Sequence, residues 1–307
     1  MRALPDVWVH RRPKGPTWGP LDDEAAAANG AGKASGAAKG AHSARARRAT
    51  FAHVLGVLTR NEFRARYRSQ ALGILWSLLN PLVQTAILTV IFSHVAAFKS
   101  AVPNYPVYLL MGVVVWQWFS TAINMATQSF IAQADIVKRT VFARQIVPLA
   151  AALSYGVNFA MESLLVLALV FIWPSAFKLS PALALVPVVL VILAALIVGV
   201  VLATSVLNVV YRDVAFLVST ALTLLYWLTP IIYPLSFVDD GAIPHVYKVL
   251  YHLNPIASIM VALRNCLMDG VVPSALTWIG MVGPTALMLA IGWAVFRHYE
   301  RMVLDYV

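Results

Sequence analysis

From residue 72 onward, the chain alternates between long apolar runs and short polar segments. A helix needs about 20 predominantly apolar residues to cross a bilayer, and six runs reach that length. They cover residues 72–97, 107–127, 146–173, 182–208, 214–234 and 274–296. The pattern predicts an all-α integral membrane protein with six transmembrane helices.

The segment before the first run predicts an amphipathic helix. Arg60, Arg64 and Arg68 recur every four residues and share one helical face, while Glu62 is placed to pair with Arg66. Such a helix lies in the membrane interface with its basic face toward anionic headgroups. This face is either a plain anchor on the inner surface or a contact with phosphate-bearing lipid substrates.

Two connections between the runs also predict structure. Residues 129–145 are amphipathic and basic, which favours a short helix on the cytoplasmic surface. Residues 235–273 are largely apolar but are interrupted by Asn254-Pro255, and the residue before a proline disfavours the helical conformation. This connection predicts two short re-entrant helices in the outer leaflet, enclosed by protein or by a water-filled cavity.

Polar residues recur at helical spacing inside the first three runs, where lipid favours apolar side chains. Because residues three and four apart share a face, each set forms one polar stripe. The stripes are Ser77, Asn80 and Gln84; Gln117, Thr121, Asn124 and Gln128; and Ser154, Asn158 and Glu162. Unpaired polar groups are costly in hydrocarbon, so the stripes face either neighbouring helices or the path of a polar substrate. Glu162 is a paired structural group, a pore-facing group or a proton relay.

Aromatic residues gather in the second and fifth runs, as Trp116, Trp118, Tyr226, Trp227 and Tyr233. Membrane Trp and Tyr residues commonly form interfacial belts, and their rings also stack on the faces of sugar rings. In one continuous helix Tyr226 and Tyr233 would share a face, because seven residues make about two turns. Trp116 and Trp118 are two residues apart, so they face different directions.

Composition agrees with a membrane protein. Of the 307 residues, 60% are hydrophobic and 12% are charged, and the mean hydropathy is +0.76; soluble domains carry about 25% charged residues. The net charge is +10, but 13 of the 23 Lys and Arg lie in residues 1–68, which does not indicate a nucleic-acid groove. Residues 22–49 are biased toward Ala, Gly and basic residues, and we expect residues 1–49 to be a disordered cytoplasmic tail before a transmembrane domain at 50–307.

The basic residues also predict the orientation. With the N-terminus inside, the inner segments after residue 50 hold ten Lys and Arg, and the outer segments hold four. By the positive-inside rule, and because the number of spans is even, both termini are expected in the cytoplasm.

The sequence does not indicate catalysis. The stretch "GAGKAS" departs from the phosphate-binding loop, because Lys33 is followed by Ala34 and position 27 is Ala. The seven His residues show no metal-ligand spacing. We expect a chain that is not an enzyme and that holds no cofactor or metal of its own.

Several segments, taken in order, resemble one family. The Arg-rich helix leads into "LGILWSLLNPLVQTAILTVIF", followed by "GVVVWQWFS", "DIVKRTVFARQIVPLA", "VLNVVYRDV", "LLYWLTPIIYPLS" and "LNPIASIMVALRNCL". Over about residues 50–307, this set is similar to the permease subunit of ABC-2 type polysaccharide exporters of the O-antigen and teichoic-acid class.

The resemblance implies a homodimer of six-span subunits with two copies of a stand-alone ATPase subunit, which would bind ATP and magnesium. The substrate would be a polyprenyl-pyrophosphate-linked polysaccharide, exported across the bacterial inner membrane. The Ala-, Val- and Arg-rich composition hints at a GC-rich genome and hence at a cell-wall galactan. Two half-helices within residues 241–271 would form an outer gate.

The resemblance also implies roles for single residues. Spans one and five of both copies would line the channel, with Ser77, Asn80, Gln84, Trp116, Trp118, Tyr226 and Tyr233 at the glycan path. The pyrophosphate would enter at the N-terminal interface helix, beside Arg60, Arg64 and Arg68. Coupling to the ATPase would use Lys138, Arg139, Phe142 and Arg144.

Two other functions stay open. One is an exporter of a drug or small lipid with the same ABC-2 architecture, and the other is a proton-coupled secondary carrier that uses Glu162. Neighbouring genes for a stand-alone ATPase and for glycosyltransferases would distinguish polysaccharide export from both.

Overall fold

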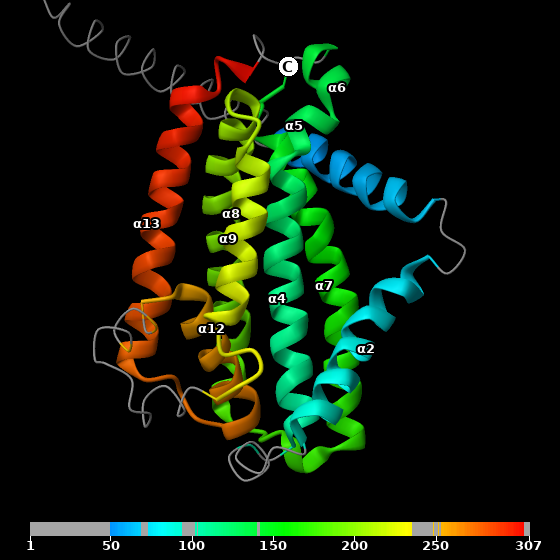
Figure 1. Ribbon diagram of the computed structural model, residues 1–307, viewed down its shortest axis with the longest axis vertical. Coiled ribbons are helices and arrows are strands. Elements are labelled where there is room, and N and C mark those ends of the chain that lie inside the picture. The colour runs from blue at the N-terminus through cyan, green and yellow to red at the C-terminus, as the bar shows by residue number, and fades with distance from the viewer. Residues whose placement is uncertain are drawn as a thin grey trace, which may run out of the picture. The chain divides into compact units, whose positions relative to one another are not determined.

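The computed structural model describes residues 50–68, 73–93, 102, 104–139, 142–234, 248, 251 and 253–303, and the regular elements of these residues are all helical (Figure 1). The tail expected at 1–49 and most of the first expected re-entrant helix lie outside the described residues.

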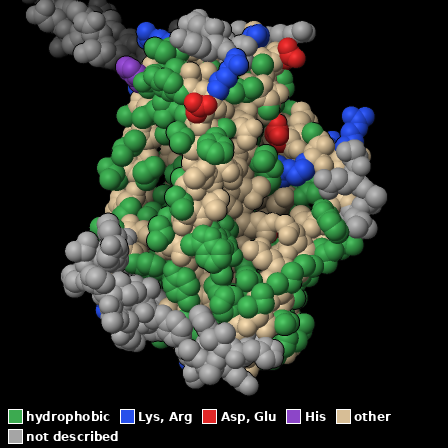
Figure 2. All heavy atoms as spheres, in the orientation of Figure 1, with side chains coloured by type: hydrophobic (Ala, Val, Ile, Leu, Met, Phe, Trp, Pro, Cys, Tyr) green, Lys and Arg blue, Asp and Glu red, His purple; other side chains and the backbone are tan. Residues whose placement is uncertain are grey.

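Among the residues that the structure describes, five helices are long and apolar enough to cross a membrane. They are α2 (Ile74–Ser93), α4 (Tyr105–Thr127), α7 (Ile146–Ile172), α8 (Val186–Val210) and α13 (Ala275–Tyr299). A helix of this kind, such as the 25-residue α8, is about 37 Å long, and the hydrocarbon core is ~30 Å thick. Hydrophobic side chains cover much of the visible surface, and most charged side chains lie in its upper half (Figure 2). The chain is a helical integral membrane protein, as predicted.

The fifth predicted span, 214–234, is not one continuous helix. The helix α9 (Val214–Trp227) has 14 residues, about 21 Å, and residues 228–234 are non-helical. Pro230 explains the break, since it lacks an N–H, its ring clashes with the carbonyl four residues earlier, and it disfavours a helical Thr229. The prediction of six full-length helices is therefore wrong here, because proline outweighs apolarity.

The helix α4 forms the centre of the bundle. It packs against α2, α7, α8 and α9, and 72% of its apolar stretch is buried, compared with 11% for α2. Leu109 and Ile123 of α4 share one core with Leu193 and Val201 of α8. Polar side chains that α4 presents to its neighbours therefore meet protein on several sides.

The helices α8 and α13 approach each other backbone to backbone. A Cβ built on Gly292 would lie 1.9 Å from the carbonyl oxygen of Gly199, and one built on Gly199 would lie 2.7 Å from the amide nitrogen of Leu289. No larger residue fits at Gly292 without moving a helix. Small residues at a crossing allow this close approach between membrane helices.

Short elements cover both ends of the bundle. After α4 come α5 (Ser129–Ala132) and α6 (Ala134–Arg139), so the single helix predicted over 129–145 is two shorter ones. A helix over residues 50–67 runs obliquely near the same end (Figure 1). Gln133 Nε2 donates a hydrogen bond to Glu62 Oε1 and ties this helix to the turn between α5 and α6. We call this the α6 end.

The opposite end, called the α12 end, carries four short elements within the described residues. They are η1 (Pro174–Ala176), η2 (Pro181–Leu185), α12 (Pro255–Arg264) and a π-helical turn, η3 (Asn265–Asp269). Asn254 caps α12 by accepting a hydrogen bond from the amide of Ile256 (3.1 Å). The helix α12 is thus the second of the two short helices predicted in this connection, and it begins at the Asn-Pro step that interrupts the apolar run.

The non-helical segment 228–234 receives hydrogen bonds from α4. Tyr105 Oη donates to the carbonyl oxygen of Ile232 (2.9 Å), and Tyr108 Oη donates to that of Tyr233 (2.8 Å). Irregular backbone at membrane depth is stable only where its polar groups are satisfied within the protein. These two tyrosines supply part of that requirement.

Arg264 satisfies two further carbonyl groups of this segment, in an arrangement that we call the Arg264 clasp. Its guanidinium donates to the carbonyl oxygens of Pro230 and Ile231 (3.0 Å for Ile231) and to the Tyr108 hydroxyl (2.6 Å). It also lies 3.4 Å from the centre of the Tyr108 ring, and the residue is only 6% exposed. Gly112 leaves the space, because a Cβ there would lie 2.7 Å from Arg264 Nη2.

Candidate functional site: two polar cavities beside α4

Two cavities lie where the predicted polar stripes meet. The α7 cavity, of about 180 Å³, lies between the helix over residues 50–67, α2, α4 and α7. The α9 cavity, of about 380 Å³, lies between α2, α4 and α9. Gln117 and Thr121 of α4 line both cavities. The helix α4 is therefore a wall shared by two polar spaces.

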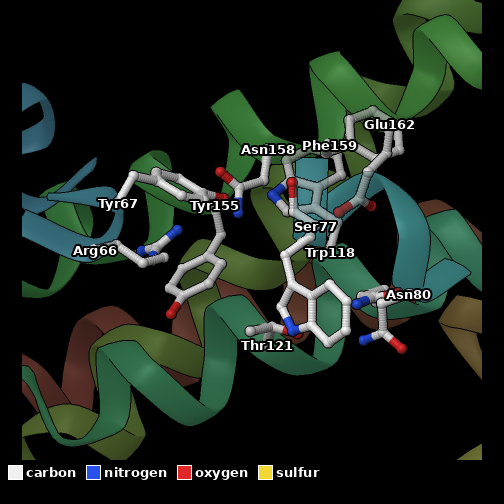
Figure 3. Close-up of a pocket in the computed structure, with 12 residues that line it drawn as sticks. Arg66, Tyr67, Ser77, Asn80, Trp118, Thr121, Tyr155, Asn158, Phe159 and Glu162 are labelled. Atoms are coloured by element: carbon white, nitrogen blue, oxygen red, sulfur yellow. The ribbon is translucent and has the colours of Figure 1, made fainter. Parts of the chain in front are cut away.

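One wall of the α7 cavity is a face of α7 (Figure 3). Tyr155, Asn158, Phe159 and Glu162 follow the spacing i, i+3, i+4 and i+7, which places them in one row. Asn158 is 8% exposed and Glu162 is 3% exposed. Among the described residues, Asn158 Oδ1 has no hydrogen-bond partner, and Glu162 forms no hydrogen bond or ion pair. A buried carboxyl group left in this way is costly and marks a functional site by default.

Arg66 lies at the other end of this cavity from Glu162 (Figure 3). Its guanidinium stacks 3.4 Å from the centre of the Tyr155 ring, and Nη2 donates to Ser154 Oγ (2.8 Å). Arg66 Nη1 is buried and has no partner in the described part of the chain. The predicted pairing with Glu62 does not form, because Glu62 accepts from Gln133 instead. Arg66 therefore brings a positive charge that no described carboxylate neutralises.

The helix α4 adds an aromatic surface to the α7 cavity. The Trp118 ring stacks on Phe159 with a centroid distance of 4.3 Å. Trp118 Nε1, a donor, and Gln117 Oε1, an acceptor, are buried, and neither has a partner among the described residues. Ser77 and Asn80 of α2 also line the cavity. Donors, acceptors and ring faces thus lie next to one another.

The α9 cavity joins the last residue of the α2 stripe to α9. Gln84 Nε2 donates to Tyr226 Oη over 3.4 Å. The Tyr226 ring meets the Trp116 ring edge-on at 5.5 Å. Ser219 and Thr223 of α9 also line this space. It therefore combines an amide, hydroxyl groups and aromatic rings.

The structure separates the aromatic residues that the sequence grouped together. Trp116 and Tyr226 line the α9 cavity, whereas Trp118 lines the α7 cavity. Tyr233 lines neither, and its Oη donates to the carbonyl oxygen of Trp227 (2.9 Å). The expectation that Tyr226 and Tyr233 share a helical face is wrong, because the helix ends at Trp227.

The arginines predicted to contact a pyrophosphate do not line the α7 cavity, whereas Arg66 does. Arg60, Arg64 and Arg68 are exposed and line neither cavity. Arg66 is two residues from Arg64 and Arg68, a rotation of about 200° on a helix, so it faces the opposite way. The four-residue repeat identified only the exposed face of this helix. The arginine that lines the cavity is Arg66, which stands beside Tyr67 on the other face.

The residues predicted to couple to an ATPase lie at the α6 end. Lys138 is exposed on α6, and Arg139 is the last residue of that helix. Phe142 packs against a buried cluster that includes Phe296 of α13. Arg144 donates a hydrogen bond to the carbonyl oxygen of Glu300, just after α13. Phe142 and Arg144 therefore connect this loop to α13, which leaves Lys138 at the surface.

Comparison with known proteins gives a consistent picture. The sequence model described as ABC-2 type transporter matches residues 53–268, which include both cavities. The O-antigen export system permease protein RfbA of Klebsiella pneumoniae is 31% identical over 253 residues, or 80% of this chain and 92% of the relative. RfbA of Myxococcus xanthus is 27% identical over 246 residues (79% and 90%), and the polysialic acid transport protein KpsM of Escherichia coli is 24% identical over 249 residues (79% and 92%).

Proposed function

Since the chain belongs to the ABC-2 type transporter family, we propose that it is the channel-forming permease that exports a polyprenyl-pyrophosphate-linked polysaccharide across the bacterial inner membrane. It is the transport component and not the ATPase of such a system. A separate ABC ATPase would bind ATP and magnesium and drive the export. Relatives named for O-antigen export and polysialic acid transport support a polysaccharide as the substrate class.

The α9 cavity carries this proposal. It lies between the first long helix, α2, and α9, and it presents Gln84, Ser219, Thr223 and Tyr226 next to the Trp116 ring. A saccharide has hydroxyl groups that pair with amides and hydroxyls, and C–H faces that pack on aromatic rings. In a homodimer with α2 and α9 at the subunit interface, two such cavities would line one channel.

We propose that α9, together with the segment after it, is the sixth segment that crosses the membrane. The helix covers about 21 Å of a ~30 Å hydrocarbon core, and the non-helical segment 228–234 would cover the remainder. Its backbone is suited to that depth, because Tyr105, Tyr108 and Arg264 satisfy the carbonyl groups of residues 230–233. Six crossings place both termini on one side, and the basic residues near the α6 end favour the cytoplasm.

The α6 end would then receive the ATPase. Lys138 on α6 would form the exposed contact, and Phe142 and Arg144 would transmit movement to α13. The exposed basic face of Arg60, Arg64 and Arg68 would lie at the same surface and attract the pyrophosphate of the arriving substrate.

Replacing Tyr226 with Leu, alone and together with Gln84→Leu, tests the glycan path. Both changes keep apolar bulk but remove the hydroxyl, the amide and the ring face from the α9 cavity. We expect export of the lipid-linked glycan to fall about tenfold or more in the double variant, because each lost hydrogen bond contributes ~1 kcal/mol. Assembly with the ATPase and basal ATP hydrolysis should stay close to wild type.

Phe171→Leu is the matched control, because this α7 aromatic is 86% exposed and lines neither cavity. It should export normally. Unchanged export in the Tyr226→Leu, Gln84→Leu double variant would remove the α9 cavity from the glycan path.

A further inference from the structure

A channel that runs through the α9 cavity does not account for the buried polar residues of the α7 cavity. It lies on the α2, α4 and α7 side of the bundle, and α4 separates part of it from the α9 cavity. Its volume of about 180 Å³ is more than ten times the ~15 Å³ that one water molecule needs. A space of this size, lined by buried polar groups, is large enough for part of a ligand.

The unpaired atoms of the cavity indicate hydroxyl groups as the ligand chemistry. Trp118 Nε1 and Arg66 Nη1 are donors, whereas Gln117 Oε1 and Asn158 Oδ1 are acceptors, and the Glu162 carboxyl group lines the same cavity. A hydroxyl group both donates and accepts, so a polyhydroxylated ring matches both kinds of atom. The Trp118 ring beside these atoms offers a flat surface to such a ring (Figure 3).

The charges of the cavity are arranged along its length. Arg66 stacks on Tyr155 at one end, and Glu162 lies seven residues further along α7, about 10 Å away. An anion is therefore attracted to the Arg66 end, where the positive charge of the cavity lies. Arg66 belongs to the helix over residues 50–67, which the sequence predicts to lie in the membrane interface, so we expect this end of the cavity to be nearer to lipid headgroups.

We propose that the α7 cavity binds the headgroup of a lipid in which a phosphate is joined to a neutral, hydroxylated ring. The phosphate pairs with Arg66, and the ring lies beside Trp118 with its hydroxyls on Asn158 and Glu162. Two kinds of lipid share this chemistry. One is the lipid-linked glycan, a source that rests on the proposed function, and the other is a phosphatidylinositol of the surrounding membrane, which does not.

Native mass spectrometry of the full chain with its ATPase, released from detergent, measures which lipids stay bound. The probes are dioleoyl phosphatidylinositol, a polyprenyl-pyrophosphate-linked disaccharide, and dioleoyl phosphatidic acid, which has the phosphate without the ring. We expect at least one of the first two to be retained about tenfold more than phosphatidic acid, a difference of ~1.4 kcal/mol. Equal retention of all three would contradict a site for the ring.

Variants locate the binding. Asn158→Leu and Arg66→Gln should each reduce retention about tenfold, and Gln117→Met provides a second interior variant if Asn158→Leu does not fold. Ser163→Ala is the control on the same helix, since its hydroxyl bonds to the Phe159 carbonyl oxygen within α7 (2.7 Å). It should leave retention unchanged. Retention that is the same in wild type, Asn158→Leu and Arg66→Gln would overturn the proposal.

The two sources give different results. Retention of phosphatidylinositol alone, lost in the variants, would make the cavity a phospholipid site whatever the transported substrate is. Retention of the linked disaccharide, lost in the variants, would place the substrate headgroup there. Failure of glycan export with normal retention of phosphatidylinositol would count against the proposed function and not against the cavity.

Discussion

Arg264 and Glu162 are both ionisable and both buried, with 6% and 3% of their surface exposed, but their surroundings are opposite. Arg264 has hydrogen bonds to Tyr108, Pro230 and Ile231 and stacks on an aromatic ring. Glu162 has no hydrogen bond or ion pair among the described residues and faces a cavity. Removing an ionisable group from water is costly in both regions, and of these two residues only Arg264 has described hydrogen-bond partners that offset the cost.

The difference separates a structural role from a functional one. A fully bonded buried charge holds elements in place, and removing it leaves its partners unsatisfied. A buried polar group without a partner lowers stability by about 1–3 kcal/mol, so it is retained where a ligand or a transported molecule uses it. By this criterion the Arg264 clasp fixes the unwound end of α9, and the α7 cavity has the features expected of the binding site that we propose.

The largest effect is expected from Arg264→Met. This change keeps much of the apolar volume but leaves the carbonyl oxygens of Pro230 and Ile231 without their donor. We expect the free energy of unfolding to fall by about 3 kcal/mol or more, since two buried acceptors lose their partners. Thermal unfolding in detergent, followed by tryptophan fluorescence, measures the loss.

Arg301→Met is the control for that experiment, because Arg301 is exposed beyond the end of α13. Its unfolding temperature should match wild type. If Arg264→Met unfolded at the wild-type temperature, the clasp would not be what stabilises the segment after α9.

A smaller effect is expected from Tyr108→Phe. The ring below Arg264 remains, but the hydroxyl that donates to the Tyr233 carbonyl oxygen and accepts from Arg264 is lost. The expected decrease is about 1–2 kcal/mol. Tyr211→Phe, at a 56% exposed tyrosine, should show no decrease. Equal unfolding temperatures for the two variants would show that the hydroxyl bonds contribute nothing measurable.

The smallest effect on stability is expected from Glu162→Leu. The direction of the change in the free energy of unfolding tests the contrast between Glu162 and Arg264. Because no described partner is lost, the free energy of unfolding should stay within about 1 kcal/mol of wild type or increase, as when buried charges are replaced by apolar residues. The same thermal unfolding assay applies. A decrease as large as that of Arg264→Met would mean that Glu162 is a structural group.

Much of the fold could be predicted from local pattern. Apolar runs located α4, α8 and α13 within a few residues, and polar spacing identified faces that now line cavities. The end of α9 could also be predicted, because Pro230 lies inside the predicted span. The apolarity of the run nevertheless favours a longer helix than the structure has. The wrong prediction of one continuous helix over 214–234 thus comes from giving too little weight to the helix-breaking effect of proline.

The Arg264 clasp and the division of the polar stripes between two cavities could not be predicted from local sequence pattern. Arg264 contacts Ile231, 33 residues earlier, and Tyr108, 156 residues earlier, and such pairs follow from tertiary packing alone. Arg66 was overlooked because repetition favoured Arg60, Arg64 and Arg68. Which helix each polar stripe faces depends on how α2 packs on α4, and periodicity does not contain that information.

The most direct test of the account is ATP-driven transport by the purified chain together with its ATPase in proteoliposomes. A polyprenyl-pyrophosphate-linked oligosaccharide, labelled on the sugar, is supplied on the ATPase side, and its arrival on the opposite side is measured. We predict translocation that requires ATP and both proteins, and that continues when any proton gradient is collapsed at constant ATP. Transport of a small amphiphile but not of the linked oligosaccharide, or transport that needs a proton gradient and not the ATPase, would contradict the account.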